Sequence, residues 1–130
     1  MTLDDAIKVA VETHAGQLDK AGKPYILHPL RVMMTVESPN LDGARLIAVL
    51  HDVIEDSEKW TIEQLDADYD AYIDELAPNP LARAVKIADL RDNLDVTRLE
   101  EVGEKAAKRI TKYLRSLRKL RRAAGQETCQ

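Results

Sequence analysis

The chain has few of the features that mark secreted or membrane-spanning proteins. Cys129 is the one cysteine among 130 residues, so no disulfide forms within the chain and a disulfide-stapled domain is excluded. No apolar run approaches the roughly 20 residues that cross a bilayer, and the N-terminus carries an amphipathic pattern in place of a signal peptide. We therefore expect a cytoplasmic protein with no membrane partner.

The sequence also lacks strand-type alternation, internal repeats and low-complexity segments, whereas helical periodicity runs through most of it. With 45% hydrophobic and 32% charged residues, 130 residues suffice for one domain with a core and are too few for two. We expect an all-α protein, with one helical domain over residues 1–125 and a polar tail over 126–130. Apolar spacing predicts six helices, at about 3–14, 29–36, 42–54, 61–73, 81–89 and 99–124, the first, third and fourth capped by Thr2, Asp42 and Thr61.

A basic face lies on the last predicted helix, although the net charge of −4 gives no overall attraction to nucleic acid. One interpretation is a non-catalytic module that binds RNA or an acidic partner, but Tyr113 falls on the apolar stripe, so no aromatic platform for bases is present. The amphipathic helix is also a candidate homodimer surface. The basic residues are Lys105, Lys108, Arg109, Lys112, Arg115, Arg118, Lys119, Arg121 and Arg122.

Four titratable residues stand at the end of the apolar run over residues 44–50. His51 and Glu55 share one strip of the predicted helix, and Asp52 and Asp56 share the adjacent one. Burying such groups costs several kcal/mol each unless a positive charge compensates, and a metal ion is one such charge. The spacing then leaves two carboxylates one turn away, able to act on a water molecule near the metal.

The three histidines, His14, His28 and His51, each lie at the polar end of an apolar pattern. Taken singly, each is explained as a hydrogen-bonded core residue, and Asp89 as a solvent-facing aspartate on a helix shoulder. Taken together, His28, His51, Asp52 and Asp89 form a set of two imidazoles and two carboxylates, which suits Mn, Fe, Zn or Mg.

Four ordered blocks of sequence resemble a known family. They are His14-Ala15-Gly16-Gln17, the stretch from Lys20 to His28-Pro29-Leu30, Leu50-His51-Asp52-Val53-Ile54-Glu55-Asp56-Ser57, and Val85-Lys86-Ile87-Ala88-Asp89 with Asn93. In this combination the chain is similar to the hydrolase half of the Rel/Spo-type alarmone enzymes and to their stand-alone small hydrolase relatives, which are HD phosphohydrolases. The resemblance implies an all-helical HD fold, Mn²⁺ as cofactor, and removal of the 3′-pyrophosphate from (p)ppGpp. From the length of the chain we expect no synthetase or regulatory region to follow.

The resemblance also implies roles for individual residues. It places the metal on His28, His51, Asp52 and Asp89, and it makes Glu55 and Asp56 the acidic pair that orients and deprotonates the attacking water. Asn93 matches a side chain near the substrate. Lys20, Lys23 and Tyr25 lie in the irregular stretch before His28, where an ammonium can meet a pyrophosphate and a ring can meet a base or ribose; ordinary loop residues are the alternative. His14 and Gln17 match the motif as supports that orient the ligands.

Because of two departures from the family pattern, substrates other than (p)ppGpp remain alternatives. Asp19 stands where the family has an arginine, which places a negative charge where a polyanionic nucleotide is expected, and the segment between Asp56 and Asp89 is shorter than in the familiar hydrolases. An adenosine alarmone, another nucleotide or a smaller phosphate ester is therefore the alternative substrate of an HD phosphohydrolase.

Overall fold

The structure is a computed structural model that describes residues 1–57, 70, 71 and 73–125, without the side chains of residues 54–57. Its helices are α1 (Leu3–His14), α2 (Leu27–Thr35), α3 (Leu41–Ser57), α5 (Pro80–Asn93) and α6 (Glu104–Ala123), and a 3-10 turn, η1 (Val96–Arg98), precedes α6. Across these described ranges, strand-type pairing is limited to one isolated bridge between Leu18 and Pro24. The predicted all-α class is confirmed.

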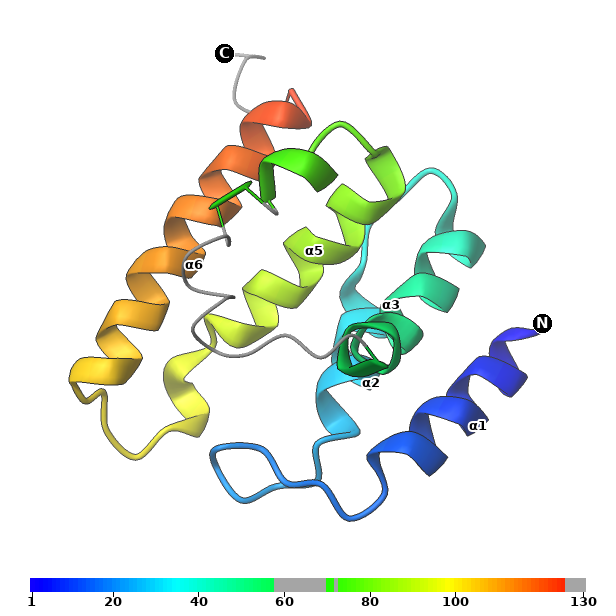
Figure 1. The fold of residues 1–130 in the computed structure, drawn as a ribbon, viewed down its shortest axis with the longest axis horizontal. Coiled ribbons are helices and arrows are strands. Elements are labelled where there is room, and N and C mark those ends of the chain that lie inside the picture. Colours follow the sequence, from blue (N-terminus) through cyan, green and yellow to red (C-terminus); the bar gives the residue numbers. More distant parts are fainter. Residues whose placement is uncertain (58–69, 72, 126–130) are drawn as a thin grey trace.

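Helix α5 lies at the centre of the molecule, with α6 on one side and α1, α2 and α3 on the other (Figure 1). It packs against α2, α3 and α6, while α1 and α2 both pack against α3. Because α5 separates two groups of helices, its two faces enter two different apolar clusters. Val85 and Ala88 belong to the larger one with α1, α2 and α3, and Leu90 packs with Ile73, Leu117 and Leu120 in the smaller one.

Of the three predicted helix caps, one is confirmed, one is wrong and one lies outside the described residues. Thr2 caps α1 in a reciprocal capping box with Asp5, as predicted. The prediction of Asp42 as the cap of α3 is wrong: the helix begins one residue earlier, and the Asn40 side chain accepts a hydrogen bond from the Gly43 N–H at 3.1 Å. Thr61 lies outside the described residues.

The second and last helices begin at other residues than predicted. Helix α2 begins at Leu27, so Pro29 lies in its first turn, where a missing N–H leaves no helical hydrogen bond unmade. Helix α6 begins at Glu104 after Gly103, because Asp95 caps the short turn η1 and the chain then runs extended through Leu99. None of the described helices combines the length and apolar character required to cross a membrane.

Candidate metal centre

Four of the predicted site residues meet where α2, α3 and α5 pack together. His28 comes from the first turn of α2, His51 and Asp52 come from the second-last turn of α3, and Asp89 comes from α5. All four are buried, with 4–9% of each residue exposed. Three separate helices therefore deliver polar side chains to one point inside an otherwise apolar junction.

The atoms that could bind a cation face one another. Asp89 Oδ1 lies 2.8 Å from His28 Nε2 and 3.2 Å from His51 Nε2. Asp52 faces the same two nitrogens, with Oδ2 at 3.5 Å from His28 Nε2 and Oδ1 at 3.2 Å from His51 Nε2. His28, His51 and Asp89 each offer one ligand atom within 4.8 Å of the others. Two imidazole nitrogens and carboxylate oxygens in this arrangement suit a divalent transition metal.

The remaining polar atoms of these side chains are also tied down. His51 Nδ1 donates to the backbone carbonyl of Ala48, and the Tyr25 hydroxyl donates to Asp52 Oδ2 at 2.7 Å. Lys86 Nζ binds Asp89 Oδ2 at 2.8 Å, and Asn93 Nδ2 donates to Asp89 Oδ1 at 3.3 Å. Outer contacts of this kind orient metal ligands in known sites, so the set fits a metal by its chemistry and by its support.

Inside the cluster, the histidines favour the charged form of the carboxylates, and the carboxylates favour the protonated form of the histidines. Burial opposes the charged form of His28, but hydrogen bonds to Asp89 and Asp92 and the nearby carboxylate charges outweigh it and raise its pKa to about 9. The pKa of His51 is also raised, against burial, by Asp89 and Asp52. Burial alone would raise the pKa of Asp89, but the charge of Lys86 and both imidazoles hold this pKa well below the ordinary value.

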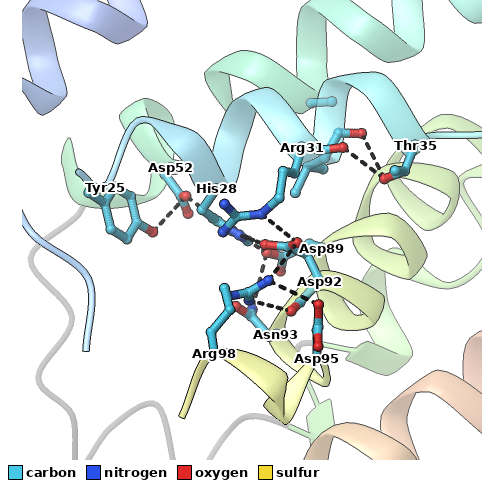
Figure 2. Close-up of polar contacts among 12 residues, drawn as sticks. Tyr25, His28, Arg31, Thr35, Asp52, Asp89, Asp92, Asn93, Asp95 and Arg98 are labelled. Carbon is cyan, nitrogen blue, oxygen red and sulfur yellow. Dashed lines mark hydrogen bonds and ion pairs between the residues drawn. The ribbon is translucent and has the colours of Figure 1, made fainter. Parts of the chain in front are cut away.

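Sequence reasoning named the four converging residues but gave no role to Lys86, Asp92 or two arginines. Asp92 Oδ2 lies 2.6 Å from His28 Nδ1, and its other oxygen meets Arg31 and Arg98 (Figure 2). Lys86 precedes Asp89 by three residues and Asp92 follows it by three, a spacing that places side chains on the same face of a helix. The three-residue spacing from Asp89 is the sequence signal that could have identified Lys86 and Asp92.

The loop before α2 supplies several of the other predicted site residues. The Tyr25 ring packs between the rings of His14 and His28, with centroids 5.1 and 5.8 Å away, and its hydroxyl points to Asp52. His14 is buried and its Nδ1 lies 3.0 Å from Gln17 Oε1. The structure therefore places His14, Gln17 and Tyr25 in a continuous layer beside the centre.

Asp19 organises the same loop. Its Oδ1 accepts hydrogen bonds from the backbone N–H groups of Ala21 and Lys23, both at 2.9 Å, and Gly22 adopts a φ of +78° within the turn. Within the described contacts, Lys23 joins this loop through its backbone. Lys20 lies near α6, since burial and then the charges of Arg109 and Lys112 lower its pKa. The charge of Lys20 is therefore within electrostatic range of two cations of α6.

For two predicted catalytic residues the structure describes only the backbone. Glu55 and Asp56 belong to the last turn of α3, one turn beyond His51 and Asp52, and their side chains lie outside the described residues.

The basic face of α6 is partly neutralised within the chain. Lys119 pairs with Asp74 at 2.9 Å, and Arg115 and Lys108 have carboxylates at 3.7 and 3.9 Å.

The fold is all-helical, and the adjacent residues His51 and Asp52 lie in a buried cluster of potential metal ligands. These two features are typical of the HD class of proteins. The family model described as "HD domain" matches residues 6–124, and the chain belongs to this family. The four clustered residues lie within the matched range.

Part of the chain is similar in sequence to two pyrophosphohydrolases and to a putative diphosphokinase. The chain is 44% identical over 69 residues to the guanosine-3′,5′-bis(diphosphate) 3′-pyrophosphohydrolase of Vibrio cholerae and 41% identical over 69 residues to that of Haemophilus influenzae, each match covering 52% of this chain and 10% of the relative. It is also 36% identical over 66 residues to the putative chloroplastic GTP diphosphokinase RSH1 of Oryza sativa, covering 50% of this chain and 7% of that protein. The chain therefore aligns with a tenth or less of the length of these relatives.

Proposed function

We propose that this protein is a metal-dependent HD phosphohydrolase that removes the 3′-pyrophosphate from a guanosine alarmone, (p)ppGpp. The observation that carries the proposal is the convergence of His28, His51, Asp52 and Asp89 from three helices on one buried point. Relatives that share 41–44% identity over half of this chain carry that activity in their names. Mn²⁺ is the proposed ion.

The chemistry needs an activated water and a stabilised leaving group. A divalent ion held by these four side chains would lower the pKa of a water molecule and draw charge from the phosphoryl oxygens. In the proposed reaction, water attacks the phosphorus joined to the ribose 3′ oxygen, the P–O bond breaks, and pyrophosphate and a 3′-hydroxyl are released. Glu55 and Asp56, one helical turn from the ligands, are the proposed proton acceptors.

Substrate binding is assigned to the loop before α2 and the residues that face it. Lys20, with Arg109 and Lys112 of α6 nearby, supplies positive charge that suits the phosphate groups of a nucleotide. Asn93, one turn after Asp89, is proposed to contact the substrate at the edge of the centre. Lys23 and Tyr25 were predicted to contact the substrate as well, and the bond from the Tyr25 hydroxyl to Asp52 favours a role in holding the metal ligand.

The geometry of Asp19 bears on the alternative substrates. Its carboxylate accepts two backbone N–H groups of its own loop, which supports a role in the turn and weakens the reason for expecting repulsion of a polyanionic nucleotide. Guanosine and adenosine alarmones therefore belong in the same assay. The ion pairs along α6 likewise weaken the alternative of a nucleic-acid-binding module.

Metal content and pyrophosphate release test the proposal together. The purified chain, stripped with EDTA and reloaded with Mn²⁺, Fe²⁺ or Zn²⁺, should bind about one ion and release pyrophosphate from ppGpp. Glu55→Gln should keep the metal and lose about 10²–10⁴-fold in turnover, whereas Asp52→Asn should lose both. A chain that binds no metal and releases pyrophosphate from neither ppGpp nor its adenosine counterpart would refute the assignment.

A further inference from the structure

Asp92 joins His28 to two arginines at the end of α5. Its side chain is 9% exposed, and its Oδ2 lies 2.6 Å from His28 Nδ1. Its Oδ1 accepts a hydrogen bond from Arg31 Nε at 2.8 Å and lies 3.4 Å from Arg98 Nη1. Arg98 Nη2 also donates to the Asp92 backbone carbonyl at 2.7 Å. Figure 2 shows the side chains of His28 and Arg31 from α2 and of Arg98 from η1 converging on Asp92.

This contact decides which nitrogen of His28 can bind a cation. A neutral imidazole has one N–H and one lone pair, and the partner of one nitrogen determines the state of the other. Asp92 is an acceptor at Nδ1, so the proton stays there and the lone pair is left at Nε2. Nε2 is the nitrogen that faces Asp89 and Asp52.

We propose that Asp92 is a positioning residue of the metal centre, which fixes the orientation and the tautomer of His28, and that Arg31 and Arg98 brace its carboxylate. This inference rests on the proposed metal site and assigns a role to a residue outside the ligand set. Acceptors that hold the outer nitrogen of a histidine ligand orient the ring and increase its basicity. Asp92 meets both requirements through a charged oxygen on a side chain that is 9% exposed.

The arginines give the carboxylate one orientation. Arg31 follows His28 by three residues on α2, and Arg98 comes from η1, beyond the end of α5. Because both guanidinium groups approach Oδ1, Oδ2 is the oxygen left for His28. The brace therefore couples the histidine to the turn that follows α5.

The second histidine is held in a different way, which makes the inference specific. His51 Nδ1 donates to the carbonyl of Ala48 in its own helix, so its orientation is set within α3 and by a neutral acceptor. His28 depends on a carboxylate from another helix, 64 residues away in sequence. Changing Asp92 should therefore disturb one imidazole and leave the other in place.

Metal affinity and ring NMR of Asp92→Asn test this role. The amide has nearly the same shape as the carboxylate but lacks its charge, and we expect metal binding to weaken by about 10- to 100-fold. Titration calorimetry with Zn²⁺ on the EDTA-stripped full chain gives the affinity. In the Zn²⁺-loaded protein, long-range ¹H–¹⁵N spectra should show a protected Nδ1 proton on His28 that is lost or shifted in the variant, while His51 is unchanged.

Two further variants separate this role from general destabilisation. Asp95→Asn is the matched control, since Asp95 contacts the same Arg98 at 3.4 Å and has no contact with His28 among the described residues; its metal affinity should stay within about twofold. Arg98→Gln removes part of the brace and should weaken binding less than Asp92→Asn. It also serves as the test if thermal melts show that Asp92→Asn does not fold.

Each outcome distinguishes this inference from the proposed function. A wild-type chain that binds no Zn²⁺ or Mn²⁺ overturns the metal centre itself. A wild type that binds metal, beside an Asp92→Asn variant with equal affinity and an unchanged His28 Nδ1 signal, leaves the centre intact and overturns the role of Asp92. Equal losses in Asp92→Asn and Asp95→Asn would show a general effect of charge in this segment.

Discussion

Replacing Tyr25 by phenylalanine separates two roles for the residue, because it removes a single hydroxyl. The ring would keep its packing against His14 and His28, whose centroids lie 5.1 and 5.8 Å away. The lost group is the O–H that donates to Asp52 Oδ2 at 2.7 Å. If Tyr25 orients a metal ligand, the substitution changes metal binding; if it contacts a base or ribose, it changes the KM of the substrate.

The size of the expected effect follows from that hydrogen bond. A hydrogen bond to a charged group contributes about 1.5–3 kcal/mol, which corresponds to roughly 10- to 100-fold in an equilibrium constant. Asp52 is 9% exposed, so water can replace the hydroxyl only in part. Tyr25 itself is half-buried, which leaves some access and favours the lower end of the range. We expect Tyr25→Phe to weaken Mn²⁺ binding by about 10-fold.

The assay compares metal dependence with substrate dependence. Activity on ppGpp, measured across a Mn²⁺ titration, should show a shifted metal requirement, and turnover should recover at saturating Mn²⁺ with an unchanged KM. Calorimetry on the stripped protein should give the same loss in affinity. A variant with wild-type metal affinity and a raised KM would refute this reasoning and return Tyr25 to the substrate pocket.

Two further predictions concern protons and the loop. The His28 pKa is raised from 6.5 to about 9, so in metal-free protein its stabilising contribution is complete below pH 6.5 and is lost as the pH rises through 9; the Tm of EDTA-treated protein should fall over this range, and a rising Tm would contradict the assignment. Asp19→Ala removes the acceptor of two backbone N–H groups and should destabilise the fold by about 1 kcal/mol in thermal melts, whereas Asp19→Asn should stay near wild type. Asp19→Arg should not lower the KM for ppGpp, and a lower KM would show that the carboxylate faces the nucleotide.

The sequence was sufficient to name the residues that converge, because each interrupts an apolar pattern. His28, His51 and Asp89 stand out as polar groups on buried helix faces, and burial of all three is what the structure shows. Helix periodicity carries this information, since it tells which residues face the core before the packing is known. The meeting of the three helices at that point could not be read from periodicity, which says nothing about which helices pack together.

The residues that surround the ligands were harder to predict for a local reason. Asp92 and Arg98 lie after Asp89, where the apolar stripe of α5 had ended and the next helix was expected to begin near Leu99. Helix α5 in fact continues to Asn93, and η1 then returns Arg98 to Asp92. A charged residue at a helix end is ordinarily solvated, so only the three-residue spacing from Asp89 distinguished Asp92 from Asp95 in the sequence.

Ion pairs surround the histidines of the centre. Lys86 pairs with Asp89, and Arg31 and Arg98 pair with Asp92, whereas the ion pairs of Asp52 are with the two histidines. Protons on the two imidazoles would then add two positive charges, the same as one divalent ion in their place.

Exchange of two protons for one such ion leaves the net charge of the buried cluster unchanged, and the cost of burying charge, which dominates inside proteins, changes little. Metal binding then competes directly with protons. Because the raised pKa of both histidines makes each hold its proton more firmly than a free imidazole does, the affinity for the ion should increase with pH.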